Sequence, residues 1–291
     1  MIRSRPFSAI SAAFRLRLEG AATGMVKFYL RHGLGLLAAV TAVAVSPSGV
    51  SARSLEAIQS RGMITLCAHA NALPFASRKN DPPGFQIELG RALAKQIGVE
   101  LGVAWVVAPT QYRAADCDIV FDAIVDPDVQ EQTRLRVSRP YHRSGVALAV
   151  PASASGIRSF RDIAAGQRVG VQVGSVAQML LDQRGVATVP YGFEDEIIEE
   201  LSAGSLAGAA VSPATIGYFN LTNPTRAVRL LYAYEDEPSL AWDVAVGMRG
   251  ADAALRQQID AALDQMLADG TVRDIYARYG IEHRAPAPTK P

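Results

Sequence analysis

Short apolar runs of the β-strand type alternate with runs of helical periodicity along most of this 291-residue chain. Residues 63–68 form one strand-like run, and a helical stripe over 85–97 follows it and ends at Gly98. The same succession returns where the strand-like run 168–173 precedes a helical run over 176–184. This order predicts an α/β fold with mostly parallel sheets and helices on both faces. Ligands of such sheets bind at the carboxyl ends of the strands, so we expect the functional site there.

Other segments continue the pattern to the end of the chain. Further strands are expected over 103–107, 119–125, 145–150, 209–211, 229–234 and 244–248. Further helices are expected over 194–202, 255–267 and 272–279. The length suits two folding units of roughly 100–150 residues each, so we expect two lobes with the site between them. The small-residue link 153–155 is one candidate boundary.

The beginning of the chain is typical of an export signal. Lys27 and Arg31 precede the uncharged apolar run 34–45, and small residues occupy 50–52, where a signal peptidase would cleave. The apolar run is shorter than the ~20 residues that span a bilayer, although a membrane anchor remains the alternative. We therefore expect 1–52 to be a leader and signal peptide.

The export signal raises the question of the true start of the protein. Met25 stands at its boundary, so translation begins there or the chain has an unusually long basic leader. In either case 53–291 is expected to be periplasmic, and its Pro-rich end, 285–291, is expected to be disordered.

The charge of the exported part excludes one class of partner. Residues 1–52 hold six of the 29 Lys and Arg residues and one of the 28 Asp and Glu residues, which leaves 53–291 with a net charge of −4. Phosphate binding needs a basic face, so nucleic acid is not an expected partner. Two Cys and four His are too few for a zinc framework, and the acidic run 116–128 lacks the Gly and terminal Glu of a calcium loop. We expect neither a metal site nor a cofactor.

Cys67 and Cys117 lie in two strand-like runs of the exported part. In an oxidising compartment they can form a disulfide. Closing the loop between residues 67 and 117 would stabilise the fold by roughly 4 kcal/mol in the chain-entropy model. The alternative is a pair of buried thiols.

Six short motifs occur in a fixed order between residues 84 and 271. They are GFQIEL at 84–89, CDIV at 117–120, SRPY at 138–141, RVGVQVGS at 168–175, LSAG at 201–204 and ADGT at 268–271. Together they resemble the extracellular solute-binding proteins of family 3, the type II periplasmic binding proteins that feed ABC transporters. This resemblance implies a monomer of two lobes, each a mostly parallel sheet flanked by helices, that meets an ABC permease.

The resemblance also implies the limits of the lobes. Lobe 1 would comprise 53–144 plus 239–284, and lobe 2 would comprise 145–238. Residues 142–144 would form the first hinge crossing and 238–241 the second.

A narrower resemblance concerns one branch of the family. The segments CA at 67–68, LPF at 73–75, RPYHRS at 139–144 and PATIGYF at 213–219 are similar to the J-type proteins of methanol oxidation, also called quinoprotein dehydrogenase-associated solute-binding proteins. The two Cys fall where that branch has them. This resemblance implies a periplasmic PQQ-dependent alcohol dehydrogenase as an alternative partner.

The residues that hold an α-amino acid in the family are replaced here. The arginine that clamps the α-carboxylate aligns with Gln130, which has neither the charge nor the fork of a guanidinium. Arg134 is the nearby substitute, or else a solvated surface arginine. The second-lobe carboxylate aligns with Pro213, and the stacking aromatic aligns with Ala72. We therefore expect a small polar solute other than a standard α-amino acid.

Several polar residues remain at strand ends and could still bind a solute. Asp122 can bond a polar ligand or a nearby amide or arginine. Arg143 can face the cavity or Asp243, and Ser175 can serve an anion or cap a helix. The expected ligand-binding residues are His69, Asn71, Phe75, Asp122, Gln130, Arg143, Gly174, Ser175, Val176, Ser212 and Thr215.

Three functions compete at this stage. The first is a solute receptor for an ABC permease, and the second is the J-type accessory role beside a quinoprotein dehydrogenase. The third is an enzyme, because some periplasmic dehydratases share this fold. No nucleophile–His–acid set, metal cluster or phosphate loop is evident, so we expect a binding protein and not an enzyme.

Overall fold

The structure is a computed structural model that describes residues 53–287. The expected leader and signal peptide, 1–52, with the alternative start at Met25, and the tail residues 288–291 lie outside the described residues. Within 53–287, no helix combines the length and the apolar character that crossing a membrane requires.

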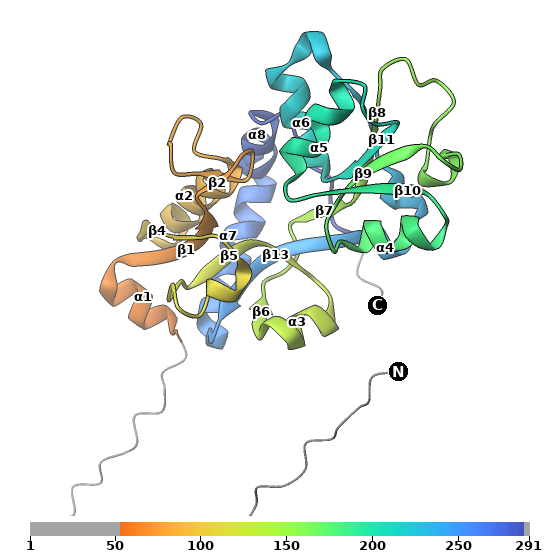
Figure 1. Cartoon of the computed structure of the whole chain (residues 1–291). Coiled ribbons are helices and arrows are strands. Elements are labelled where there is room, and N and C mark those ends of the chain that lie inside the picture. Colours follow the sequence, from red (N-terminus) through yellow and green to blue (C-terminus); the bar gives the residue numbers. More distant parts are fainter. Residues whose placement is uncertain (1–52, 288–291) are drawn as a thin grey trace, which may run out of the picture. The chain divides into compact units, whose positions relative to one another are not determined.

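The first sheet gathers strands from distant parts of the chain (Figure 1). Its order is β4-β1-β5-β13-β6, and β7 pairs with the beginning of β13. Its strands are β1 (Met63–His69), β4 (Glu100–Val106), β5 (Ile119–Ile124), β6 (Leu135–Val137), β7 (His142–Gly145) and β13 (Ala241–Arg249). β1 runs parallel to β4 and β5, whereas β13 runs antiparallel to β5, β6 and β7.

Three helices pack against one another over this sheet: α2 (Phe85–Ile97), α7 (Ala253–Ala268) and α8 (Thr271–Ala277). The apolar stripe of α2 is buried, and Gly98 ends the helix in the left-handed conformation at φ 81°, as expected. Two further short helices are α1 (Leu55–Arg61), which contacts β1 and α7, and α3 (Pro127–Thr133), which precedes β6. The expected helices over 85–97, 255–267 and 272–279 are thus confirmed, the last one ending at Ala277.

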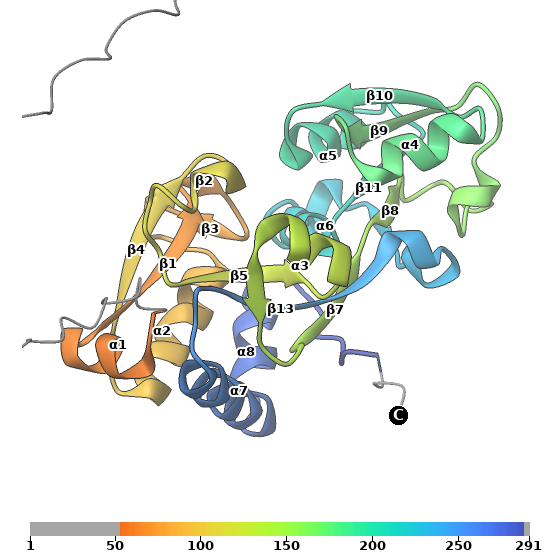
Figure 2. The same ribbon diagram turned by 90° about the horizontal axis from the view of Figure 1, so that it is seen from below.

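The second sheet has the order β10-β9-β11-β8-β12. Figure 2 shows it with α4 and α5. Its strands are β8 (Ala147–Val150), β9 (Arg168–Gln172), β10 (Ala187–Tyr191), β11 (Gly208–Val211) and β12 (Arg229–Leu231), and its helices are α4 (Val176–Gln183), α5 (Glu194–Ser202) and α6 (Pro213–Thr222). β9 runs parallel to β10 and β11, and β8 runs antiparallel to β11 and β12.

The chain crosses between the two sheets twice, at β7–β8 and again before β13. The crossings touch, because the Val146 amide donates to the Leu240 carbonyl at 2.9 Å. A Cβ at Gly145 would lie 2.2 Å from the same carbonyl oxygen. Only glycine therefore allows the two crossings to lie this close.

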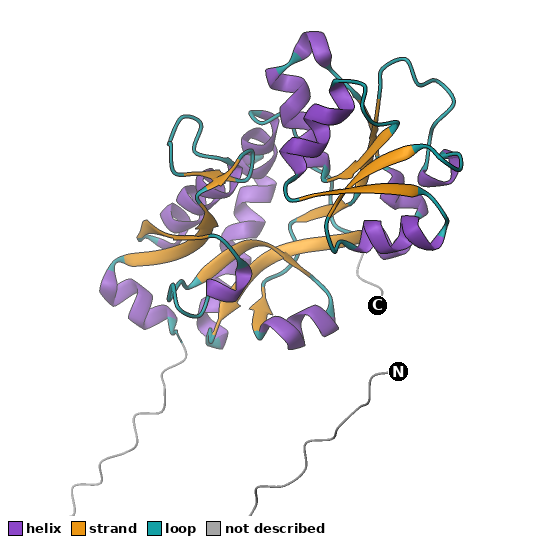
Figure 3. Ribbon diagram, in the orientation of Figure 1, coloured by secondary structure: helices purple, strands orange, loops and turns teal. Residues whose placement is uncertain are grey.

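The expected fold class is confirmed: both sheets are flanked by helices (Figure 3). The sheets are parallel only in part, because β13 and β8 enter them in the opposite direction. The strand expected over 229–234 ends at Leu231, since Ala233–Asp236 form the 3₁₀ helix η4. Elements that the sequence analysis did not expect are α1, α3, α6, β6, β7, β10 and the small hairpin of β2 (Asn71–Ala72) and β3 (Ala76–Ser77). The tail residues 285–287 have no helix or strand.

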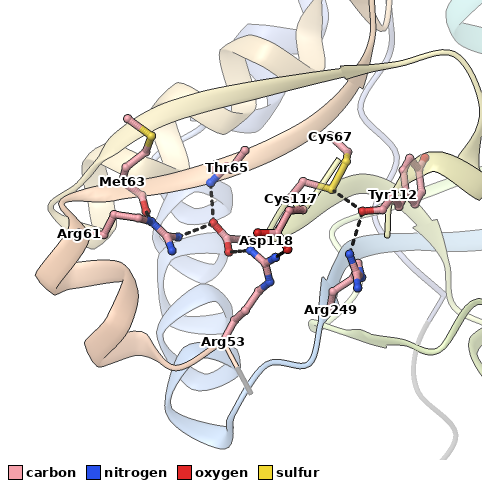
Figure 4. Close-up of polar contacts among 10 residues, drawn as sticks. Arg53, Arg61, Met63, Thr65, Cys67, Tyr112, Cys117, Asp118 and Arg249 are labelled. Atoms are coloured by element: carbon pink, nitrogen blue, oxygen red, sulfur yellow. Dashed lines mark hydrogen bonds and ion pairs between the residues drawn. A yellow bond between two sulfur atoms is a disulfide. The ribbon is translucent and has the colours of Figure 1, made fainter. Parts of the chain in front are cut away.

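An ion cluster joins the start of β5 to β1 (Figure 4). The Asp118 carboxylate is fully buried and accepts bonds from the Thr65 amide at 2.8 Å, from Arg61 at 2.7 Å and from Arg53. The disulfide between Cys67 and Cys117, with a Cα–Cα distance of 5.4 Å, confirms the expected pairing and ties the same two strands together. Since β1 and β5 share a single register pair, these side-chain links carry much of their attachment.

We expect Asp118→Asn to lower the free energy of unfolding by about 2–3 kcal/mol, because it removes the buried charge that pairs with two arginines. The matched control is Asp116→Asn, whose side chain is 82% exposed and contacts Arg53 alone, and which should change stability by less than about 0.5 kcal/mol. Urea unfolding of the two variants measures both values. Equal losses would contradict the role given to Asp118.

Candidate functional site

Two adjoining cavities lie where β1, β5, β9 and β11 end, as expected for this fold class. Their volumes are about 300 Å³ and about 590 Å³. Phe75, Gln172 and Glu194 line both of them. These volumes fall in the range of small-molecule sites.

The smaller cavity takes its walls from both sheets. The first sheet and its helices supply Phe85, Asp122, Trp242 and Tyr276 among others. The segments that follow β9, β10 and β11 supply Ser175 and Val176, Glu194, and Ser212 to Ala214. A solute bound here would contact both halves of the fold at once.

Asp122 reaches this cavity through an irregularity in β5. Phe121 and Asp122 together lie opposite the single residue Val246 of β13, so β5 has a β-bulge at this point. Asp122 has a φ of 57°. Aspartate tolerates this left-handed conformation better than most residues. The bulge changes the direction of the Asp122 side chain relative to a regular strand.

The Asp122 carboxylate is held on both oxygens. Oδ1 accepts from the Tyr141 hydroxyl at 2.7 Å, and Oδ2 accepts from Gln86 Nε2 at 2.7 Å. Burial raises the pKa of Asp122 above its ordinary value, although both hydrogen bonds oppose that shift. The group is therefore fixed in position and easier to protonate than an exposed aspartate.

Glu194 is the carboxylate that the sequence analysis missed. It is the first residue of α5, yet its side chain turns to the start of α6. Its oxygens accept from the Ser212 amide at 3.0 Å, from the Ser212 hydroxyl at 2.7 Å and from the Thr215 hydroxyl. The sequence placed Glu194 only at the start of the expected helix 194–202, and strand β10 before it was not expected.

His142 lies in the wall of the smaller cavity without adding a positive charge. Its ring lies 4.8 Å from that of Tyr276 and 5.5 Å from that of His283, measured between centroids. Burial, helped by His283, lowers the pKa of His142 to about 3. The imidazole is therefore neutral at physiological pH.

The larger cavity extends along the surface of α5 and α6. One wall is formed by His69, the last residue of β1, and by Asn71 and Phe75, which follow this strand. Three carboxylates, Glu194, Asp195 and Glu199, lie on the other side with Thr215 and three aromatic residues, Phe193, Tyr218 and Phe219. Like the smaller cavity, it has no Lys or Arg among its described lining residues.

Most of the expected site residues come together in these cavities. They are His69, Asn71, Phe75, Asp122, Ser175, Val176, Ser212 and Thr215. Ser175 also caps α4, since its hydroxyl accepts from the Gln178 amide at 3.1 Å. Trp242 also lines the smaller cavity and packs against the apolar core of the first sheet.

Three expected site residues line neither cavity. Gln130 lies within α3, which holds it away from both cavities. Arg143 bonds Asp243 at 3.3 Å, and this pairing satisfies its charge. The Gly174 amide donates to Gln178 Oε1 at 2.7 Å. Arg134, the nearby substitute for the arginine that clamps a carboxylate, is exposed at the end of α3.

Residues 64–282 match the bacterial extracellular solute-binding proteins, family 3. The chain belongs to this family. It has the two-lobed type II periplasmic binding protein fold.

Individual relatives are distant. The chain is 27% identical over 244 residues to the membrane-bound lytic murein transglycosylase F of Desulfosudis oleivorans, an alignment that covers 79% of this chain and 51% of that protein. The chain thus spans about half the length of this relative. It is 24% identical over 261 residues to the L-cystine-binding protein TcyJ of Escherichia coli K12, covering 85% of this chain and 95% of that protein.

Among solved structures, an ancestral cationic amino acid solute-binding protein has a TM-score of 0.66 and 24% sequence identity, with 78% of this chain and 99% of that chain covered. This likeness supports the fold.

Asp122→Asn tests the environment of this carboxyl group. In the wild type, a raised pKa means that the folded protein binds the proton more tightly than the unfolded chain. That contribution to stability is complete below the unfolded pKa and is lost as pH rises through the folded pKa. We therefore expect the free energy of unfolding of the variant, relative to the wild type, to increase as pH rises from the unfolded pKa of about 3.9 through the raised pKa of the folded protein.

Denaturant unfolding of both proteins in the same buffers measures the difference between their free energies of unfolding. The contributions of all other titrating groups cancel in this difference. Asparagine keeps the shape and tolerates the positive φ. A difference that stays constant or decreases with pH would contradict the raised pKa.

Proposed function

We propose that this protein is the exported binding component of an ABC transporter and captures a small polar solute between its two lobes. Lobe 1 would comprise 53–144 plus 239–284, and lobe 2 would comprise 145–238. The leader 1–52 would direct the protein to the periplasm, where it acts as a monomer. Membership of the solute-binding family supports this role.

One observation carries the proposal: the smaller cavity is walled by residues of both sheets, next to the two chain crossings. A solute that contacts both walls would be bound more tightly when the lobes close on it. Differential affinity of this kind shifts a hinge equilibrium, and the closed form can then be recognised by a permease.

We further propose that the solute is not a standard α-amino acid. A free α-carboxylate normally needs a guanidinium partner. The described residues that line the two cavities include neither Lys nor Arg. The position of the family's clamp, Gln130, and the nearby Arg134 both lie outside these linings.

A second candidate is the accessory role beside a periplasmic quinoprotein dehydrogenase. The observation that favours it is the Cys67–Cys117 disulfide, which joins the two cysteines at the positions where the J-type branch has them. In that case the partner would be a protein surface, and the cavities would need no solute.

A thermal-shift screen of the secreted protein separates the two candidates. The panel contains amines, amino acids, organic acids, short alcohols, PQQ and lanthanide salts. A solute at 100 times its dissociation constant adds about 2.7 kcal/mol, which is expected to raise Tm by about 5–10 °C for a chain of this size.

Two variants make the screen specific for the cavity. Val176→Trp places a large side chain at the wall of the smaller cavity and should abolish the shift. Met179→Trp, three residues further along α4, adds the same side chain at a residue that is 56% exposed and lines neither cavity, and should keep it. A flat response of the wild type, together with capture of an apo-dehydrogenase, would replace the receptor by the accessory role.

A further inference from the structure

The walls of the smaller cavity indicate the charge of the solute. We propose that the solute is a small organic cation, with an ammonium or guanidinium group and no carboxylate. This inference rests on the proposed function, because it takes this cavity as the place where the solute binds.

The first observation is the balance of charge in the cavity. Asp122 enters from the first sheet and Glu194 from the segment after β10. The described lining has no Lys or Arg, and the neutral His142 does not compensate. Two carboxylates in a partly enclosed space attract a cation more strongly than they would in bulk water.

The second observation is that the chain already fixes both carboxylates with neutral donors. Gln86 and Tyr141 hold Asp122, and Ser212 and Thr215 hold Glu194. Such donors orient a carboxylate but leave its charge in place, and each ionised carboxylate has further lone pairs to accept bonds. The two groups are therefore preorganised for a charged donor from outside the chain.

The third observation concerns the aromatic residues of the cavity. Tyr276 lines the cavity and is 1% exposed, and its hydroxyl makes no hydrogen bond of normal geometry among the described residues, although it lies near Tyr141 and Asp122. Buried hydroxyl groups are normally bonded, so this hydroxyl is available to a polar group of a ligand. Its ring lies 5.0 Å from that of Phe85, and Phe75 and Trp242 complete an aromatic lining suited to an organic cation.

The same cavity does not suit a carboxylate. The turn between β9 and α4 was the expected anion site, yet the Gly174 amide donates to Gln178 Oε1 and the Ser175 amide donates to the Gln172 carbonyl. These two donors are therefore engaged within the chain. A ligand carboxylate would meet Asp122 and Glu194 without an arginine to offset their repulsion.

A bare metal ion is also a poor match. Within 53–287, no group of three or more His, Cys, Asp and Glu side chains is arranged to hold a metal. The aromatic lining favours an organic cation, whose carbon skeleton can contact the rings.

The test uses two pairs of probes that differ by one carboxylate: cadaverine with L-lysine, and agmatine with L-arginine. Isothermal titration of the secreted protein should give at least tenfold tighter binding of each amine than of its amino acid. Glu194→Gln should weaken binding of the amine at least tenfold. Glu196→Gln, which removes the same charge two residues further along at an exposed residue outside both cavities, should bind like the wild type.

Asp122→Asn provides a second variant should Glu194→Gln disturb the start of α6, and it should also weaken binding of the amine. Circular dichroism and Tm confirm that each variant is folded.

The outcomes separate the two levels of the proposal. Equal or tighter binding of the amino acids, or binding of an organic acid or a lanthanide that Val176→Trp abolishes, would overturn the cationic solute and leave the receptor role standing. A wild type that binds no member of the panel would overturn the receptor role and this inference together.

Discussion

The attachment of β5 to β1 is the constraint on which the site depends. The two strands share only the register pair of Leu66 and Ile119, and further links come from the Asp118 amide, which donates to the Thr65 carbonyl, from the Asp118 carboxylate and from the neighbouring disulfide. Asp118 is fully buried, so its charge is acceptable only because arginines and an amide surround it. Since Asp118 directly precedes β5 and Asp122 lies four residues later on that strand, the cluster also fixes where the Asp122 carboxylate enters the cavity.

The two cavity carboxylates are presented in different ways. Asp122 lies in a bulge of β5 with a φ of 57°, and Glu194 is the first residue of α5, shortly after the chain leaves β10. Regular elements on each side hold both positions, and side-chain hydrogen bonds hold the carboxylates themselves. A rigid framework of this kind commonly positions the few residues of a binding site.

The sequence predicted those elements whose apolar residues follow one clear period. The buried stripe of α2 and its terminal Gly98 are an example. Helix α6 was missed because it is buried on nearly all sides and has no polar face to reveal a helical period. The bulge at Asp122 and the inward turn of Glu194 depend on tertiary hydrogen bonds with Tyr141 and Ser212, distant in the sequence, so no local pattern could indicate them.

The loss of one positive charge would change what a site of this kind can bind without changing its fold. In the family's usual amino-acid site, as the sequence resemblance implies, an arginine balances the solute's carboxylate and an acidic residue balances its ammonium. We propose that Gln130, which lies within α3 and outside both cavities, takes the arginine's place, while Glu194 adds a carboxylate from a different element. The packing of both sheets does not depend on these two residues, because neither Gln130 nor Glu194 belongs to the buried apolar core. The electrostatic balance of the cavity is altered instead, since the remaining carboxylates are best neutralised by a solute that brings positive charge alone.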